Sequence, residues 1–295
     1  MSGFSPQWLA LREPADNAAR DTDLAADLAR RLAGHAGGPN GEQRIVDLGA
    51  GTGSNLRATA PLLGPRQSWR LLDHDPALLD AARGVLRNWG ADQGLTPRDE
   101  DGRLLLEGPA RCITICFAQA DLAASLDAIG ADRPHLVTAS AFFDLVSEEW
   151  IARFAEEVAR NAALFFTVLT CDGRDAWHPG HAADGEIARA FKVHQSRDKG
   201  FGPAAGAAAS ALLATAFGAR GYGTRAADSP WRLGPAERHL IDALAEGTAS
   251  AAAETGLLAQ ETVTAWLTAR RTATCEIGHI DLLAWPPETG SLIFG

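Results

Sequence analysis

A carboxylate at the end of a predicted strand leads directly into a glycine-rich turn in residues 44–55, RIVDLGAGTGSN. The acid is Asp47, and Gly49, Gly51 and Gly53 follow it at alternate positions. Because glycine has no Cβ and tolerates positive φ, such a turn lets the backbone bend sharply and touch a ligand. The amides that follow open a predicted helix, whose N-terminus attracts an anionic group. The stretch therefore predicts a cradle for a nucleotide-like ligand.

The spacing of the glycines argues against a dinucleotide site. The dinucleotide fingerprint, G-x-G-x-x-G, has its third glycine one residue later, where this chain has Ser54. An acid directly before the turn, Asp47, is also a poor neighbour for a pyrophosphate and a good one for a cation. We therefore expect a ligand that carries positive charge.

Two further acids stand in residues 69–80, WRLLDHDPALLD. Asp73 ends a predicted strand. Asp75 is followed by Pro76, which is the pattern of a helix N-cap with proline at the first helical position. The two carboxylates therefore have different predicted tasks, Asp73 in the ligand site and Asp75 in capping. The alternative is that both residues are caps.

With these motifs the chain resembles the class I S-adenosylmethionine-dependent methyltransferases, whose first motif is acid-x-G-x-G-x-G. The resemblance covers residues 40–170 at the level of motifs and the final strands by topology only. It implies S-adenosyl-L-methionine as the cofactor, S-adenosyl-L-homocysteine as the product, and in-line methyl transfer. It further implies that Asp73 holds the ribose hydroxyls and that Asp121, in the sequence QAD after the third strand, accepts the adenine amino group. The alternative for Asp121 is a helix N-cap, and both roles are compatible.

The N-terminal segment contains charged residues at a helical spacing of four, Arg12, Asp16 and Arg20. Such a row is typical of a solvated, ion-paired helix face. The alternative is that Arg12 or Arg20 reaches the cofactor carboxylate. The predicted cofactor-binding residues are Asp47, Gly49, Ala50, Gly51, Gly53, Asn55, Asp73, His74, Asp121, Leu122, Ser140 and Arg20.

The acceptor is expected beside the segment after the fourth strand, residues 141–146, AFFDLV, because ligands bind outside the carboxyl ends of parallel strands. Phe143 is a predicted substrate contact there, and Asp144 a candidate base. Trp231 is a further predicted substrate contact, with a tryptophan at the edge of the core as the alternative.

The chain has only two lysines, Lys192 and Lys199, and both lie in the polar segment FKVHQSRDKGFGP after the fifth strand. We predict that Lys199 contacts the substrate. The alternative is an exposed helix end with a positively charged last turn. A general base is needed only where the acceptor loses a proton, and the candidates are His194, Asp144 and Asp198, in that order.

No metal site is predicted. His178, His181 and Asp184 offer ligand types, but Pro179 and Gly180 interrupt any helical frame between them. The four cysteines form no CxxC pair and are predicted to be free thiols. The sequence has neither an apolar run of transmembrane length nor a secretory signal pattern, so we expect a cytoplasmic protein without membrane contact.

The charge balance favours a small-molecule acceptor. The chain has 27 basic and 37 acidic residues, a net charge of −10, which makes nucleic acid an unlikely partner. The position where amino-methylating enzymes of this class have an NPPY-like motif reads SAFF, which argues against exocyclic base amines. A macromolecule methyltransferase and a non-catalytic cofactor-binding regulator remain alternatives. The acceptor atom and the oligomeric state stay open.

The resemblance implies an α/β fold, with a Rossmann-like, mostly parallel sheet of seven strands and helices on both faces. Residues 1–40 form an N-terminal helical cap, broken near Pro14, and residues 41–295 form the methyltransferase domain. A lid-like insertion is expected at residues 171–203 and a helical insertion at residues 228–272. An inserted loop or hairpin is expected at residues 90–110. The resemblance implies that the last strand, residues 275–285, is antiparallel.

Overall fold

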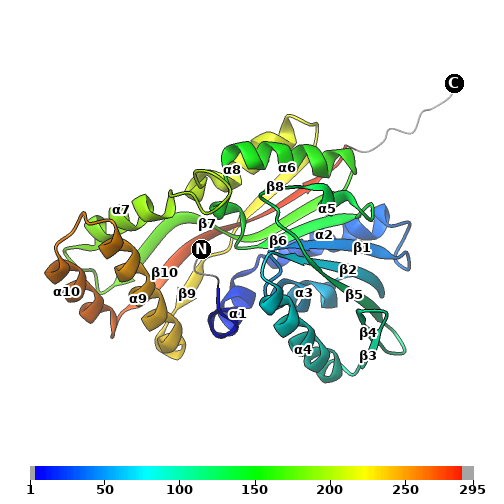
Figure 1. Cartoon of the computed structure of the whole chain (residues 1–295), viewed down its shortest axis with the longest axis horizontal. Coiled ribbons are helices and arrows are strands. Elements are labelled where there is room, and N and C mark those ends of the chain that lie inside the picture. The colour runs from blue at the N-terminus through cyan, green and yellow to red at the C-terminus, as the bar shows by residue number, and fades with distance from the viewer. Residues whose placement is uncertain (1–3, 288–295) are drawn as a thin grey trace.

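The structure, a computed structural model, describes residues 4–287 of the chain. Residues 1–3 of the predicted N-terminal cap and residues 288–295 of the predicted methyltransferase domain lie outside the described residues. One sheet runs through the described part (Figure 1), in the order β3-β4-β5-β2-β1-β6-β7-β10-β8, and β9 pairs with β10. Its strands are β1 (Gln43–Leu48), β2 (Arg66–Asp73), β3 (Thr96–Glu100), β4 (Arg103–Glu107), β5 (Cys112–Gln119), β6 (Leu136–Ser140), β7 (Leu164–His178), β8 (Gly223–Asp228), β9 (Trp231–Leu233) and β10 (Thr274–Trp285).

The centre of the sheet has the predicted arrangement. Neighbouring strands from β5 to β7 are parallel, and β10 is antiparallel between β7 and β8. These strands make up the seven expected. The sheet as described has ten strands, because the 90–110 segment forms the hairpin β3-β4 on one edge and β9 adds to β10. The hairpin is confirmed, and the strand count of seven is too low.

Helices cover both faces of the sheet. They are α1 (Pro6–Ala19), α2 (Thr22–His35), α3 (Ser54–Thr59), α4 (Pro76–Asp92), α5 (Asp127–Gly130), α6 (Glu148–Arg160), α7 (Asp184–Gln195), α8 (Ala209–Gly218), α9 (Arg238–Glu254) and α10 (Gln260–Arg270). Side-chain oxygens of Ser5, Asp21, Asp75 and Ser147 accept backbone N–H bonds at the starts of α1, α2, α4 and α6. No helix within residues 4–287 is long and apolar enough to cross a membrane.

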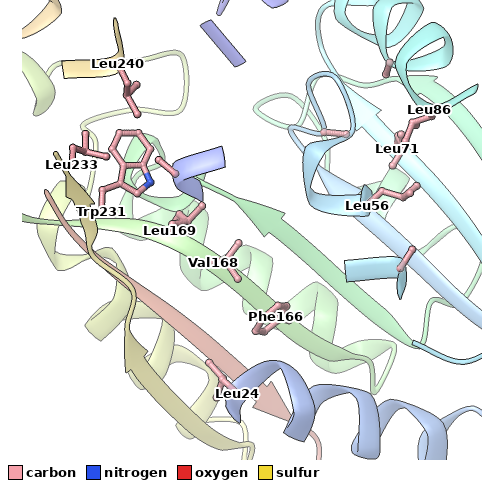
Figure 2. Close-up of a cluster of buried hydrophobic side chains, with 14 of the residues drawn as sticks. Leu24, Leu56, Leu71, Leu86, Phe166, Val168, Leu169, Trp231, Leu233 and Leu240 are labelled. Atoms are coloured by element: carbon pink, nitrogen blue, oxygen red, sulfur yellow. The ribbon is translucent and has the colours of Figure 1, made fainter. Parts of the chain in front are cut away.

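The core lies in two layers, one on each face of the sheet. Successive side chains of a strand point to opposite faces, so Ile45 joins the layer under α2 and α4 while Val46 joins the layer under α6 and α8. Figure 2 shows part of the first layer, in which Trp231 lies among Leu233 and Leu240. All four cysteines are free, as predicted.

The break between the N-terminal helices lies later than predicted. Pro14 is inside α1, and the chain turns at Arg20 instead. A proline removes one backbone donor, which a helix tolerates near its start but less well in its interior. The turn forms where the Asp21 carboxylate accepts the N–H of Leu24 at 2.7 Å and so begins α2.

The fifth strand of the predicted sheet also extends further than expected. We expected β7 to end at Thr170, but it continues to His178 because its second half pairs with β10, with Trp177 opposite Cys275. The first eight residues of the predicted insertion 171–203 therefore belong to the sheet. Beyond them, α7 packs against α9, and α7, α9 and α10 gather at one end of the molecule (Figure 1).

A buried carboxylate on β10 joins three parts of the fold. Asp281 is fully buried and accepts the N–H of Leu169 at 2.8 Å, the N–H of Asp21 at 3.0 Å and the hydroxyl of Ser229 at 2.6 Å. These donors belong to β7, to the start of α2 and to the loop before β9. Asp281 therefore holds the N-terminal helices against the sheet.

We predict that Asp281→Asn destabilises the protein by about 2 to 4 kcal/mol, because the amide turns an N–H2 group towards buried donors. Urea unfolding followed by circular dichroism measures the change. The control is Glu276→Gln, which removes an exposed β10 carboxylate paired with Arg232 and should change stability by less than about 0.5 kcal/mol. Equal effects of the two substitutions would contradict the prediction.

Candidate functional site

A cavity of about 660 Å³ opens at the carboxyl ends of β1, β2 and β6. Ligand sites of parallel sheets lie at these ends. The predicted cofactor residues that line it are Gly49, Ala50, Gly51, Asn55, Asp73, His74, Asp121, Leu122 and Ser140. Three others, Asp47, Gly53 and Arg20, do not line it. The structure thus brings most of the predicted set to one cavity, and their binding roles stay predictions.

The glycine turn has the backbone conformation that its sequence implies. Gly49, Gly51 and Gly53 have φ of 59°, 53° and 79°, in the left-handed region that disfavours side chains. The Asp73 carboxylate accepts the N–H of Gly51 at 2.8 Å and the N–H of Asp75 at 3.0 Å. Asp73 therefore shapes the cradle as well as facing the cavity.

The capping assignment of Asp75 is correct, whereas Asp121 holds a turn and caps no helix, because α5 begins only at Asp127. Asp75 accepts the N–H of Ala77 at 2.9 Å at the start of α4. Asp121 accepts the N–H groups of Ala123 and Ala124 at 3.0 and 3.3 Å. Because Asp121 is exposed and also lines the cavity, these hydrogen bonds within the turn leave the adenine role open.

Asp47 lies directly behind the cradle and is 0% exposed. Its Oδ1 accepts the side-chain amide of Asn55 at 2.7 Å, whereas its Oδ2 is buried with no partner among the described residues. Burial raises the pKa of Asp47 from 3.8 to about 7, against the opposing effects of Asn55 and Arg20. A cation bound in the cavity would favour the ionised form of this carboxyl.

Arg20 reaches the cradle from behind. Its Nη1 donates to Asn55 Oδ1 at 3.0 Å and to Thr59 Oγ1 at 3.2 Å. The predicted contact between Arg20 and a cofactor carboxylate does not match this position, because the guanidinium supports α3 instead of lining the cavity.

The helix α1 covers the cradle. Leu9, Arg12 and Asp16 of α1 line the cavity, and a Cβ on Gly51 would meet Leu9 at 2.9 Å. An ion pair of 2.5 Å between Glu13 and Arg57 fastens α1 to α3. The predicted N-terminal cap is therefore part of the cavity wall.

Trp231 stands behind this wall and does not line the cavity. Arg12 binds Asp16 through two hydrogen bonds of 2.9 and 3.1 Å, and the Trp231 indole N–H donates to Asp16 at 3.0 Å. The Arg12 guanidinium lies 4.9 Å from the Trp231 ring centre. Trp231 thus positions the Arg12–Asp16 pair, and the alternative of a tryptophan at the core edge describes its place.

The two phenylalanines after β6 have different positions. Phe143, the predicted substrate contact, is fully buried in the core and does not reach the cavity. Phe142 does line it, and a Cβ on Gly49 would lie 2.8 Å from the Phe142 ring. Asp144 is half-buried just behind the lining, and loss of hydration raises its pKa to about 6.

The three polar candidates of the segment after β7 separate in the structure. His194 lies on α7 away from the cavity, with Nε2 3.1 Å from Glu254. Asp198 accepts the N–H groups of Gly200 and Gly202 at 2.7 and 2.9 Å, so its carboxylate organises a loop. Lys199 lines the cavity, as expected for a substrate contact.

The sequence reasoning did not single out several lining residues. Among them are Leu9, Gln119, Leu145 and Phe201. Gln119 ends β5 directly before the predicted acid and had a local signal, namely its place at a strand end. Leu9 comes from α1 and Phe201 from the 198–202 loop, which only the tertiary structure brings to the cavity. Leu145 belongs to the segment 141–146, which was expected beside the acceptor.

No family model and no curated protein matches the chain. Among solved structures, it is similar to a cyclopropane-fatty-acyl-phospholipid synthase-like protein from Lactobacillus casei, with 13% identity, a TM-score of 0.51 and coverage of 96% of this chain and 95% of that one. It is also similar to an S-adenosylmethionine-dependent methyltransferase from Geobacter sulfurreducens in complex with S-adenosyl-L-homocysteine, with 15% identity, a TM-score of 0.45 and coverage of 96% and 99%. The chain has the Rossmann-like fold of class I S-adenosylmethionine-dependent methyltransferases.

We predict that Asp47 makes the ligand-free protein less stable as pH rises from about 5 to 7. The folded carboxyl keeps its proton up to a pKa of about 7, whereas the unfolded one loses it near 3.8, so the contribution is present at low pH and lost on the way up. The stability of the native chain minus that of Asp47→Asn should fall by about 2 kcal/mol over this window. Urea unfolding at pH 5, 6, 7 and 8 measures it.

The matched control is Asp80→Asn, which removes an exposed carboxyl from α4. Its difference from the native chain should change by less than about 0.5 kcal/mol over the same window. A difference for Asp47→Asn that is flat, or that rises with pH, would contradict the assignment.

Proposed function

We propose that this protein transfers the methyl group of S-adenosyl-L-methionine to a small-molecule acceptor. The observation that carries the proposal is the cradle of Gly49, Gly51 and Gly53, held by Asp73 and backed by the unpartnered oxygen of Asp47. Such a site combines backbone donors for an anionic group with buried negative charge for a cation. S-adenosyl-L-methionine has both groups in one molecule.

Different residues of the cavity would bind different parts of the cofactor. Asp73, at the end of β2, would accept the ribose hydroxyls, and Asp121, after β5, would accept the adenine amino group. The amides at the start of α3 would receive the carboxylate. This division agrees with the strand order, because β5, β2 and β1 lie side by side.

When bound, S-adenosyl-L-methionine supplies a methyl group already activated by its sulfonium. The chain must then orient the acceptor and keep water out. Leu9 from α1, Phe142 from the β6 end and Phe201 from the following loop enclose the cavity with apolar surface. For an acceptor that must lose a proton, we favour Asp144 among the three candidate bases. It lies between the lining residues Phe142 and Leu145 in the chain, and its pKa of about 6 allows it to take up a proton near neutral pH.

The size and charge of the chain favour a small acceptor over a macromolecule. A cavity of about 660 Å³ has the volume usual for small-molecule sites. The net charge of −10 disfavours a nucleic-acid surface. A regulator that only binds the cofactor would need no wall for an acceptor, whereas this cavity is also lined by α1 and by Lys199.

We predict that S-adenosyl-L-homocysteine binds to the protein in isothermal titration calorimetry and that Asp73→Asn raises its Kd about 100-fold. The amide would face the Gly51 N–H with a second donor, so the variant loses both an acceptor and the shape of the turn. Asp80→Asn, on the exposed side of α4, is the control and should bind as the native chain does.

Failure of both S-adenosyl-L-methionine and S-adenosyl-L-homocysteine to bind at millimolar concentration would refute the proposed function. If Asp73→Asn binds the cofactor as tightly as the native chain does, the cofactor is retained but its site is not this cradle.

A further inference from the structure

We propose that the acceptor is an organic anion with an apolar body, and that the Lys199 ammonium holds its negative group. The proposal rests on the proposed function and adds the chemical class of the second substrate. Lys199 lines the same cavity as the cradle.

Within residues 4–287, the charge of Lys199 has no acidic partner. Its nearest polar contact is the main-chain oxygen of His194 at 3.5 Å, which is a long hydrogen bond. Among the described residues, no carboxylate forms an ion pair with it, although its sequence neighbour is Asp198. The other lysine, Lys192, is exposed on α7. A half-buried ammonium without a counter-ion attracts an anion from solution.

The loop that carries Lys199 is held in place on both sides. Asp198 accepts the N–H groups of Gly200 and Gly202, whose φ values of 103° and 86° suit only glycine well. Phe201 packs edge-on against Phe142 and Trp150, at ring distances of 5.7 and 5.6 Å. Asp198 is therefore a positioning residue for Lys199, and the ammonium has a defined position beside the cavity.

In this proposal, the acidic residues Asp73 and Asp121 of the cavity lie on the cofactor side and Lys199 lies on the acceptor side. Asp73 and Asp121 lie at the ends of β2 and β5, on the cofactor side of the strand order. Arg12 is neutralised by Asp16, to which it makes two hydrogen bonds. Among the described residues that line the cavity on the side of β6 and the 198–202 loop, Lys199 is then the charged one without an ion pair. An anionic acceptor supplies the missing counter-charge.

The rest of this side is apolar. Phe201 is two residues from Lys199 and packs against Phe142, and both rings line the cavity together with Leu145 and with Leu9 of α1. A ligand that meets these side chains buries hydrocarbon surface while its charged end meets the ammonium. The acceptor therefore has a hydrocarbon or aromatic body beside its carboxylate, sulfonate or phosphate group.

Two fluorescent probes test this inference. They are 1-anilinonaphthalene-8-sulfonate and N-phenyl-1-naphthylamine, which share an aromatic body and differ in the sulfonate. Titrated into protein saturated with S-adenosyl-L-homocysteine, the sulfonate should bind about tenfold more tightly than the neutral probe. Lys199→Gln should abolish most of this preference, and Lys192→Gln, the matched control, should preserve it.

Calorimetry with S-adenosyl-L-homocysteine on the same variants separates the two proposals. No cofactor binding by the native chain refutes the proposed function. If the cofactor binds, the anion inference is overturned by equal affinities of the two probes, by no sulfonate binding, or by a preference that survives Lys199→Gln. A loss of cofactor affinity in Lys199→Gln would also overturn it, because the ammonium would then hold the cofactor carboxylate.

Discussion

The position of the Arg20 guanidinium is the constraint on which the cavity depends. It donates to Asn55 and Thr59 of α3, and the carboxylates of Asp281, Asp16 and Asp47 all act on its charge. Asn55 in turn binds Asp47, and Asp281 binds the first residue after Arg20. The cradle, the N-terminal helices and the far strands of the sheet therefore meet at one cation. A buried charge is tolerated only where opposite charges and hydrogen bonds surround it.

Burial of carboxyl groups around the cavity costs free energy of hydration, which a bound cation would offset. The pKa of Asp47 is raised to about 7 and that of Asp144 to about 6, in both cases chiefly by loss of hydration. Without a ligand, the protonated form of each carboxyl is therefore favoured more than it would be in water. A cation nearby would stabilise the charged form. The same carboxyls that reduce the stability of the empty fold at neutral pH favour binding of a positively charged ligand. Ionisable groups with shifted pKa values are often found at functional sites for this reason.

The sequence predicted the features that depend on neighbours in the chain. The glycine turn, the cap Asp75 and the loop or hairpin expected at residues 90–110 each have a local pattern, whereas the antiparallel last strand was expected from the family resemblance. The role of Trp231 had no local pattern in the sequence, because its partner Asp16 is 215 residues away. The length of β7 depended on pairing with β10, and His194 faces Glu254 on a helix that the strand pattern could not place. Local propensity decides the elements, and tertiary contacts decide which side chains share a cavity.

The two halves of the cavity therefore carry different kinds of information. The proposed cofactor half comes from the ends of β1, β2 and β5, and the similarity to a solved structure at 13% identity concerns the fold of these strands. The proposed acceptor half adds α1 and the 198–202 loop, which lie outside the motif-bearing residues 40–170, to Phe142 and Leu145 after β6. Phe142 joins the halves, since it faces Gly49 on one side and Phe201 on the other. Acceptor specificity must then be argued from Lys199, Arg12 and their apolar neighbours, because the fold leaves those positions free to vary.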